Sequence, residues 1–198
     1  MKTIIFDIDG TITNMWPIEK SVLLDITQRR FENDVEQMKL SGISDTYKIF
    51  LRLSHQKMSK KNYTNLYKKT FSILLKNDQL PKPEKYPLTN WILDNKERYR
   101  FVSATGGQKI EAHYVLKIFK VIRYVDLIHS IDKTSCRFSK KTGIPFRKIK
   151  SKFKNCILIS DSNDDCKGAQ LAKVPFVLIE PRQRIVSIVD KHTILLLP

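Results

Sequence analysis

Two carboxylates at the end of a buried strand constrain this chain more than any other feature. Thr3 to Phe6 is a short apolar, β-branched run that predicts a buried strand, and Asp7 and Asp9 follow it. Ionised carboxylates are costly in such a place unless a partner compensates their charge, which a divalent cation does well. Because successive strand side chains point to opposite faces, both can serve one site only if the chain curls, as Gly10 permits.

The segment IIFDIDGT, residues 4–11, resembles the first motif of the haloacid dehalogenase (HAD) superfamily of phosphohydrolases. The resemblance implies that Asp7 attacks phosphorus and forms an aspartyl-phosphate. It implies that Asp9 protonates the leaving group and then activates water, with Thr11 in a supporting role. On the residues alone, the same segment is also explained as an acidic turn after a strand.

A second acidic cluster follows another apolar run. The segment NCILIS, residues 155–160, predicts a buried strand, and Asp161, Asp164 and Asp165 come directly after it. It resembles the superfamily's fourth motif, with Ser160 where the family usually has glycine. The resemblance implies that Asp161 holds Mg²⁺ and that Asp165 positions the basic residue of the third motif, with Asp164 as the alternative. By itself the cluster also suits a helix N-terminus, where acidic residues are favourable.

A hydroxyl residue follows a third predicted strand, Tyr99–Val102. By resemblance to the second motif, Ser103 and the backbone at Ala104 bind the phosphoryl oxygens. The pair Gly106–Gly107 leaves the backbone open, and a helix is predicted just after it, which suits an anion. Thr105 is the competing assignment, and Ser103 is preferred because it lies closer to the predicted strand end.

The third motif of the family supplies a lysine that neutralises charge on the aspartyl and phosphoryl groups, often in a KPxP context. The proline directly after the lysine is missing here. Lys140 is preferred because Phe146 follows six residues later, similar to the family's aromatic spacing. Lys141 and Lys133 are the alternatives, and a lysine in so basic a chain is usually a solvated surface group.

Strand and helix patterns alternate after residue 88. Strands are predicted at Val125–Ile131, Asn155–Ser160 and Val174–Ile179 and again at Ile194–Leu197, in addition to the two above. Alternation of this kind predicts an α/β, Rossmann-like three-layer core with a mostly parallel sheet. Ligands bind outside the carboxyl ends of such strands, which is where Asp7, Ser103 and Asp161 fall.

A segment with helical periodicity alone separates the first two strands. Residues 17–77 predict a small all-helical bundle, and three prolines between residues 80 and 87 end it. We therefore expect a discontinuous core domain of residues 1–14 and 88–198 and an α-helical cap domain of residues 15–87. In the family, an insertion at this position closes over the site, excludes water and selects the substrate.

The chain is strongly basic. It has 36 Lys and Arg against 20 Asp and Glu, a net charge of +16, which favours phosphorylated or other acidic partners. The basic run 147–154 and the lysines of the helical segment are each explained by a solvated helix face or by contact with a phosphate backbone. Three cysteines without CxxC spacing, no secretory signal and no apolar run of about 20 residues predict a cytoplasmic protein outside the membrane.

Together these features predict a phosphoric monoester hydrolase that depends on Mg²⁺, held by Asp7, the backbone carbonyl of Asp9, and Asp161. The expected substrate is a phosphorylated small molecule: a sugar phosphate, a phosphoglycolate-like molecule or a nucleotide. A nucleic-acid-binding or nucleic-acid-end-processing phosphatase is the alternative, motivated by the charge of +16. A phosphomutase with the same motifs is the second alternative, and a catalytically inert interaction module is the third. The sequence does not indicate an oligomeric state.

Overall fold

The computed structural model describes residues 1–43, 45–130 and 139–179. The described residues divide into a core unit, residues 1–14 and those from 84 onward, and a helical unit, Met15–Pro83. Lys133 and the strand expected at 194–197 lie outside the described residues. In the parts that the structure describes, no helix is long and apolar enough to cross a membrane.

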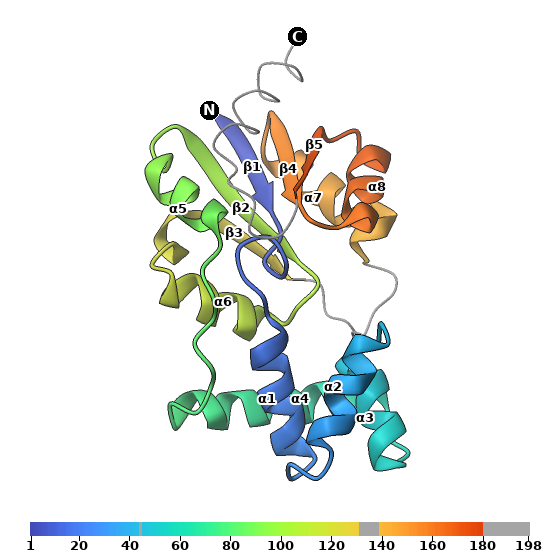
Figure 1. Ribbon diagram of the computed structural model, residues 1–198. Coiled ribbons are helices and arrows are strands. Elements are labelled where there is room, and N and C mark those ends of the chain that lie inside the picture. The colour runs from blue at the N-terminus through green and yellow to red at the C-terminus, as the bar shows by residue number, and fades with distance from the viewer. Residues whose placement is uncertain (44, 131–138, 180–198) are drawn as a thin grey trace. The chain divides into compact units, whose positions relative to one another are not determined.

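The core unit is built on a five-stranded sheet in which every described strand pair is parallel (Figure 1). The strands are β1 (Lys2–Phe6), β2 (Tyr99–Thr105), β3 (Val125–Ser130), β4 (Cys156–Ser160) and β5 (Phe176–Leu178). Their order in the sheet is β3-β2-β1-β4-β5. The expected α/β, Rossmann-like fold is confirmed, but β2 continues to Thr105 instead of ending at Val102.

The central position of β1 sets the place of the site. The chain runs outward from β1 through β2 to β3 and then returns to β4 on the other side of β1. At such a reversal of strand order, the carboxyl ends of the strands form a crevice that binds ligands. Phe6 is in register with Ile159 of β4 and with Ser103 of β2, so the residues that follow β1 and β4 lie at the same edge of the sheet.

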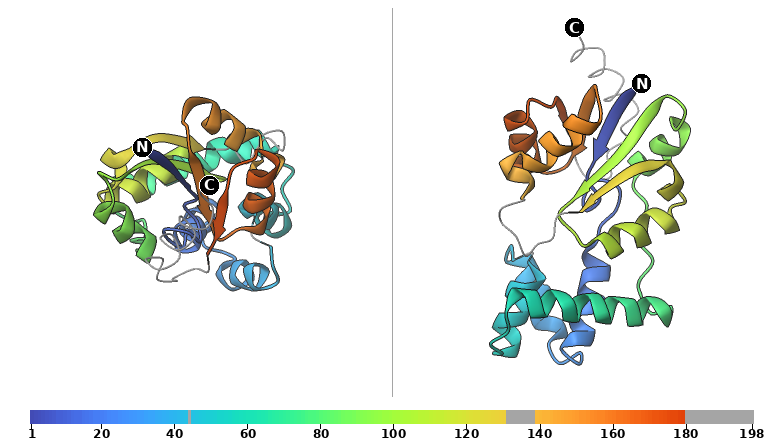
Figure 2. Two further views of the ribbon diagram at one scale, coloured as in Figure 1. Left: turned by 90° about the horizontal axis from the view of Figure 1, so that it is seen from above. Right: turned by 180° about the vertical axis from the view of Figure 1, so that it is seen from behind.

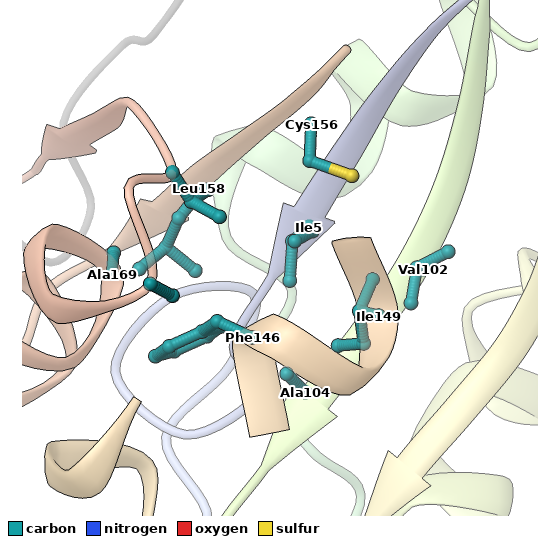
Figure 3. Close-up of a cluster of buried hydrophobic side chains, with 10 residues drawn as sticks. Ile5, Val102, Ala104, Phe146, Ile149, Cys156, Leu158 and Ala169 are labelled. Atoms are coloured by element: carbon teal, nitrogen blue, oxygen red, sulfur yellow. The ribbon is translucent and has the colours of Figure 1, made fainter. Parts of the chain in front are cut away.

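Helices cover both faces of this sheet. Helices α5 (Pro87–Asp94) and α6 (Lys109–Ile118) lie on one face, and α7 (Ile144–Lys152) and α8 (Asn163–Leu171) lie on the other (Figures 1 and 2). Two 3₁₀ turns, η1 (Ile122–Tyr124) and η3 (Lys140–Thr142), join these elements. Under α7 and α8 lies a continuous apolar cluster that includes Ile5, Val102, Ala104, Phe146, Ile149, Leu158 and Ala169 (Figure 3).

The helical unit consists of α1 (Trp16–Ile26), α2 (Glu32–Leu40), α3 (Thr46–Ser54) and α4 (Lys60–Lys76). Side chains cap two of these helices: Asp45 accepts from the Tyr47 N–H at the start of α3, and Ser59 accepts from the Asn62 N–H at the start of α4. The unit has its own core, in which the ring centroids of Phe50 and Tyr63 lie 5.1 Å apart.

Phe146 of α7 is fully buried in this apolar cluster. We expect Phe146→Ala to lower the free energy of unfolding by about 3–5 kcal/mol, because it removes a large apolar side chain and leaves a cavity. Phe146→Leu fills most of that space and should cost clearly less. Urea denaturation measures both, and a loss below about 1 kcal/mol for Phe146→Ala would contradict this account of the core.

Candidate active site

The turn after β1 brings Asp7 to the carboxyl edge of the sheet. The Asp7 N–H donates to the carbonyl oxygen of Ile159 at 3.3 Å, which extends the β1–β4 pairing by one residue. The chain then turns, because the N–H groups of Thr11 and Ile12 both donate to the Ile8 carbonyl oxygen, at 3.3 and 3.0 Å. The side chain of Asp7 is buried by this turn.

Gly10 and Thr11 join this turn to the one that follows β4. Gly10 has a φ of +76°, and a Cβ on it would lie 1.9 Å from Oδ2 of Asp161. The glycine is therefore needed both for its conformation and for the close approach of the carboxylate. The Thr11 hydroxyl donates to Oδ1 of Asp161 at 2.9 Å and accepts from the Asp161 N–H at 3.3 Å. The structure thus brings the first and fourth motifs together.

Lys140 lies between two buried carboxylates. Its Nζ is 2.6 Å from Oδ2 of Asp7 and also contacts Oδ2 of Asp165. The three side chains are only 11%, 9% and 4% exposed, in the order Lys140, Asp7, Asp165. The ammonium group therefore balances two carboxylates in a place with little water.

Lys141 and Asp164, the alternatives to Lys140 and Asp165, lie outside this buried group. The side chain of Lys141 is 61% exposed and pairs with the exposed carboxylate of Asp164 at 3.6 Å. Of the described candidates, the geometry therefore favours Lys140 as the lysine beside Asp7 and Asp165 as its second partner. The catalytic roles of these residues stay predictions.

Ser160 is a site residue whose importance the sequence did not reveal. Its hydroxyl donates to Oδ2 of Asp165 at 2.8 Å, the same oxygen that Lys140 contacts, and accepts from the Ser162 N–H at 3.2 Å. A glycine at position 160 would lack both bonds. The only sequence signal was that serine stands where the family usually has glycine.

The Lys140 backbone rests directly on α8. A Cβ on Gly168 would lie 1.9 Å from the carbonyl oxygen of Lys140. The same carbonyl accepts from the N–H of Gly143, which ends η3 with a φ of +72°. This close docking fixes the lysine where the chain lacks the family's proline. The sequence signal for this contact was Gly168 itself. A glycine inside a helix costs about 1 kcal/mol relative to alanine and so indicates a close approach.

The structure weakens the reason for choosing Ser103 over Thr105 as the phosphoryl-binding hydroxyl. That choice assumed that the strand ends at Val102, whereas β2 ends at Thr105. Ser103 pairs with Phe6 inside the ladder, and its buried hydroxyl has no hydrogen-bond partner among the described residues. Ala104 belongs to the apolar cluster. Thr105 ends the strand, and its hydroxyl accepts from the Gly107 N–H at 3.1 Å. The strand-end hydroxyl is therefore that of Thr105.

Burial dominates the electrostatics of the site. It raises the pKa of the Asp7 carboxyl to about 7, with Lys140 opposing this shift and Asp165 adding to it. Burial also acts to lower the pKa of Lys140, but Asp7 and Asp165 outweigh it and the net shift is upward. The lysine is thus firmly cationic, whereas Asp7 needs further positive charge to stay ionised at neutral pH.

One buried oxygen of Asp7 is of the kind that a magnesium ion binds. The buried Oδ1 of Asp7 has no hydrogen-bond partner among the described residues, and carboxylate and carbonyl oxygens are the donors that Mg²⁺ prefers. The described residues contain no cluster of three His, Cys, Asp or Glu side chains arranged for a metal. The predicted magnesium ligands are two side chains, Asp7 and Asp161, and the backbone carbonyl of Asp9. The side chain of Asp9 is exposed and is not one of these ligands. This set stays a prediction.

Gly168→Ala should destabilise the protein, although alanine normally stabilises a helix interior by about 1 kcal/mol. The new methyl group would push the Lys140 backbone away, and overpacking of this kind costs about 1–3 kcal/mol. Gly106→Ala is the control, because a Cβ there meets nothing within 4 Å and should change stability by less than about 0.5 kcal/mol. Urea denaturation compares the two, and a stabilising Gly168→Ala would contradict the docking.

Asp7→Asn should stabilise the metal-free protein, and more so at higher pH. The pKa of the carboxyl is ~3.9 in the unfolded chain, whereas burial raises it to about 7 in the folded protein. Between these values the folded state binds more protons, so wild-type stability falls as the pH rises. The advantage of the variant should therefore grow between pH 4 and 7 when unfolding is followed in EDTA. A constant or shrinking advantage would refute this, and Asp164→Asn is the matched control for carboxylate removal.

Comparison with known proteins gives the family. The sequence profile of the haloacid dehalogenase-like hydrolases matches residues 4–179. No curated protein matches the chain. A HAD-superfamily hydrolase of subfamily IA, variant 1, from Geobacter sulfurreducens has a similar structure, with a TM-score of 0.67 and 17% identity over 96% of each chain.

Two further solved structures share the fold. A predicted phosphoglycolate phosphatase from Haemophilus somnus gives a TM-score of 0.66 at 18% identity, covering 96% of this chain and 90% of its own. A HAD hydrolase from Bacillus subtilis bound to magnesium gives 0.58 at 16% identity, covering 90% and 86%. At such identities these likenesses show the fold alone. The profile match, from β1 to the residue after β5, shows that this chain belongs to the haloacid dehalogenase-like hydrolases.

Proposed function

We propose that this hydrolase is a Mg²⁺-dependent phosphatase that cleaves phosphoric monoesters of small molecules through an aspartyl-phosphate on Asp7. The buried contact of Lys140 with Asp7 and Asp165 carries the proposal, because it places a fixed cation at the proposed nucleophile. The membership of the HAD-like hydrolases supports it.

In the proposed reaction, a carboxylate oxygen of Asp7 attacks phosphorus and the bond from phosphorus to the leaving oxygen breaks. Asp9 gives its proton to the leaving oxygen. Asp9 then takes a proton from the water that attacks the aspartyl-phosphate, which releases inorganic phosphate and restores Asp7. The exposed side chain of Asp9 suits this role, since it can exchange protons with solvent.

Charge compensation is what the buried site must provide. Asp7 is a nucleophile only when ionised, and burial acts against ionisation. Lys140 offsets part of this effect. Bound Mg²⁺, held by Asp7, Asp161 and the carbonyl of Asp9, would supply the remaining positive charge that lets a carboxylate approach a phosphate. The magnesium bound to the Bacillus subtilis relative supports this cofactor.

We assign the phosphoryl contacts of the second motif to Thr105 and the backbone of Gly106, in preference to Ser103 and Ala104. Thr105 ends β2, and space beside Gly106 is open.

We also propose that the helical unit acts as the cap that selects a small phosphorylated substrate, such as a sugar phosphate, a phosphoglycolate-like molecule or a nucleotide. The buried free thiols of Cys156 and Cys166 support a cytoplasmic setting.

Release of inorganic phosphate from a panel of phosphorylated metabolites, with Mg²⁺ and with EDTA, tests the proposal. Asp7→Asn should abolish turnover and leave the circular dichroism spectrum unchanged, because it removes the nucleophile. Asp9→Asn should lower kcat by about 10²–10⁴-fold. Asp164→Asn, an exposed acid of the same cluster, should keep its activity. Full activity of Asp7→Asn would end the mechanism, and isomerised product without phosphate release would indicate a mutase.

A further inference from the structure

Positive charge is concentrated in one half of the helical unit. Residues 46–77, which contain α3 and α4, have no Asp or Glu at all. Their basic residues are eight: Lys48, Arg52, Lys57, Lys60, Lys61, Lys68, Lys69 and Lys76. The preceding residues 15–45 instead carry six acidic and four basic side chains. The charge of this unit is therefore unevenly placed and is not a uniform basic background.

Four of these lysines form a row along α4, here called the α4 lysine row: Lys61, Lys68, Lys69 and Lys76. All four are exposed, and they recur at intervals of seven or eight residues, about two helical turns, which places them on one side of the helix. The row is about 22 Å long, since each residue adds ~1.5 Å along the axis. The opposite side of α4 is buried in the unit and carries the apolar and aromatic side chains.

No carboxylate in the described residues neutralises this row. On α4, the ion pair that the structure contains is between Lys60 and Asp45, at 3.7 Å, outside the row. The second basic run of the chain, on α7, differs. There Arg147 donates to the Leu171 carbonyl at 3.4 Å and Lys150 to the Lys173 carbonyl at 2.7 Å, so both serve the C-terminal end of α8. Two basic side chains of the α7 run thus bind backbone carbonyls, whereas the described residues provide no such contact for the side chains of the α4 lysine row.

We propose that the α4 lysine row is a docking surface for the phosphate backbone of double-stranded nucleic acid. Lysine is a flexible point charge that suits a regular series of phosphates. The aromatic side chains of α4, Tyr63, Tyr67 and Phe71, are buried, so this surface offers no platform on which single-stranded bases stack. Most apolar side chains of α4 are likewise buried in the unit, and the exposed Ile73 and Leu75 offer little area to insert into a membrane.

Binding of a duplex through this row should weaken steeply as the salt concentration rises. Four lysine–phosphate contacts on a duplex give a slope of about −3.6 for log K against log salt concentration. Raising the salt from 50 to 200 mM should therefore weaken binding by about 150-fold. Each lysine removed should reduce the slope by about 0.9.

Fluorescence anisotropy with a labelled 24-base-pair duplex tests this, in EDTA and with hydroxyl ends so that the proposed catalytic site has no terminal phosphate to bind. The first variant changes the four lysines of the row to glutamine, which has a similar helix propensity. The control changes four exposed lysines of the core unit to glutamine, Lys85, Lys117, Lys120 and Lys154, and has the same net charge. Circular dichroism and urea denaturation check that both variants fold.

We expect the wild type and the control to bind with the slope given above, and the row variant to bind at least about 100-fold more weakly at 50 mM salt with a slope near zero. Equal losses in the two variants would overturn the proposal, because net charge alone would then explain binding. Absence of wild-type binding at 50 mM salt would also overturn it. Row-dependent binding to phosphatidylserine vesicles without duplex binding would assign the surface to membranes, since Ile73 and Leu75 are exposed near the end of α4.

Discussion

The candidate site depends on one buried lysine that two carboxylates share. Lys140, Asp7 and Asp165 are all largely withdrawn from water, where an unpaired charge is very costly. Removal of the lysine would leave both carboxylates uncompensated, and the loss of one side of a buried ion pair typically costs about 3–5 kcal/mol. The group is nevertheless incomplete, with two negative charges and one positive. It is held together by structure elsewhere, chiefly the Ser160 hydroxyl on Asp165 and the Gly168 backbone under Lys140.

The parallel sheet explains why residues so distant in sequence meet. Each loop that carries a site residue leaves the carboxyl end of a strand, and β1 lies between β2 and β4. Asp7 follows β1 and Asp161 follows β4, and Thr11 ties the two loops through two hydrogen bonds. Lys140 comes from the segment before α7, which packs on the same face of the sheet as α8 (Figure 1). The fold therefore supplies positions, and short polar contacts supply the final alignment.

The sequence predicted the fold class and the acidic loops because these depend on local patterns: apolar runs, a glycine turn and alternating elements. It misplaced the end of β2 because Ser103 and Ala104 have little strand preference and two glycines follow Thr105 directly. Their strand conformation comes from pairing with β3, where Thr105 is in register with Ser130. The choice between Lys140 and Lys141, and the importance of Gly168, depended on a contact between η3 and α8. Such a contact between distant segments has no signature in one sequence.

The overall charge and the local charge of this protein have opposite signs, and they act over different distances. The net charge of +16 draws phosphorylated molecules toward the protein, but salt screens this field beyond about 8–10 Å. Close to Asp7, Asp161 and Asp165 the local field is that of carboxylates, acting at contact distance where little water weakens it. A basic surface therefore accelerates encounter without making the site receptive to phosphate. Only positive charge inside the site can do that, which is why the buried ammonium of Lys140 and a cation would complement each other in the proposed mechanism.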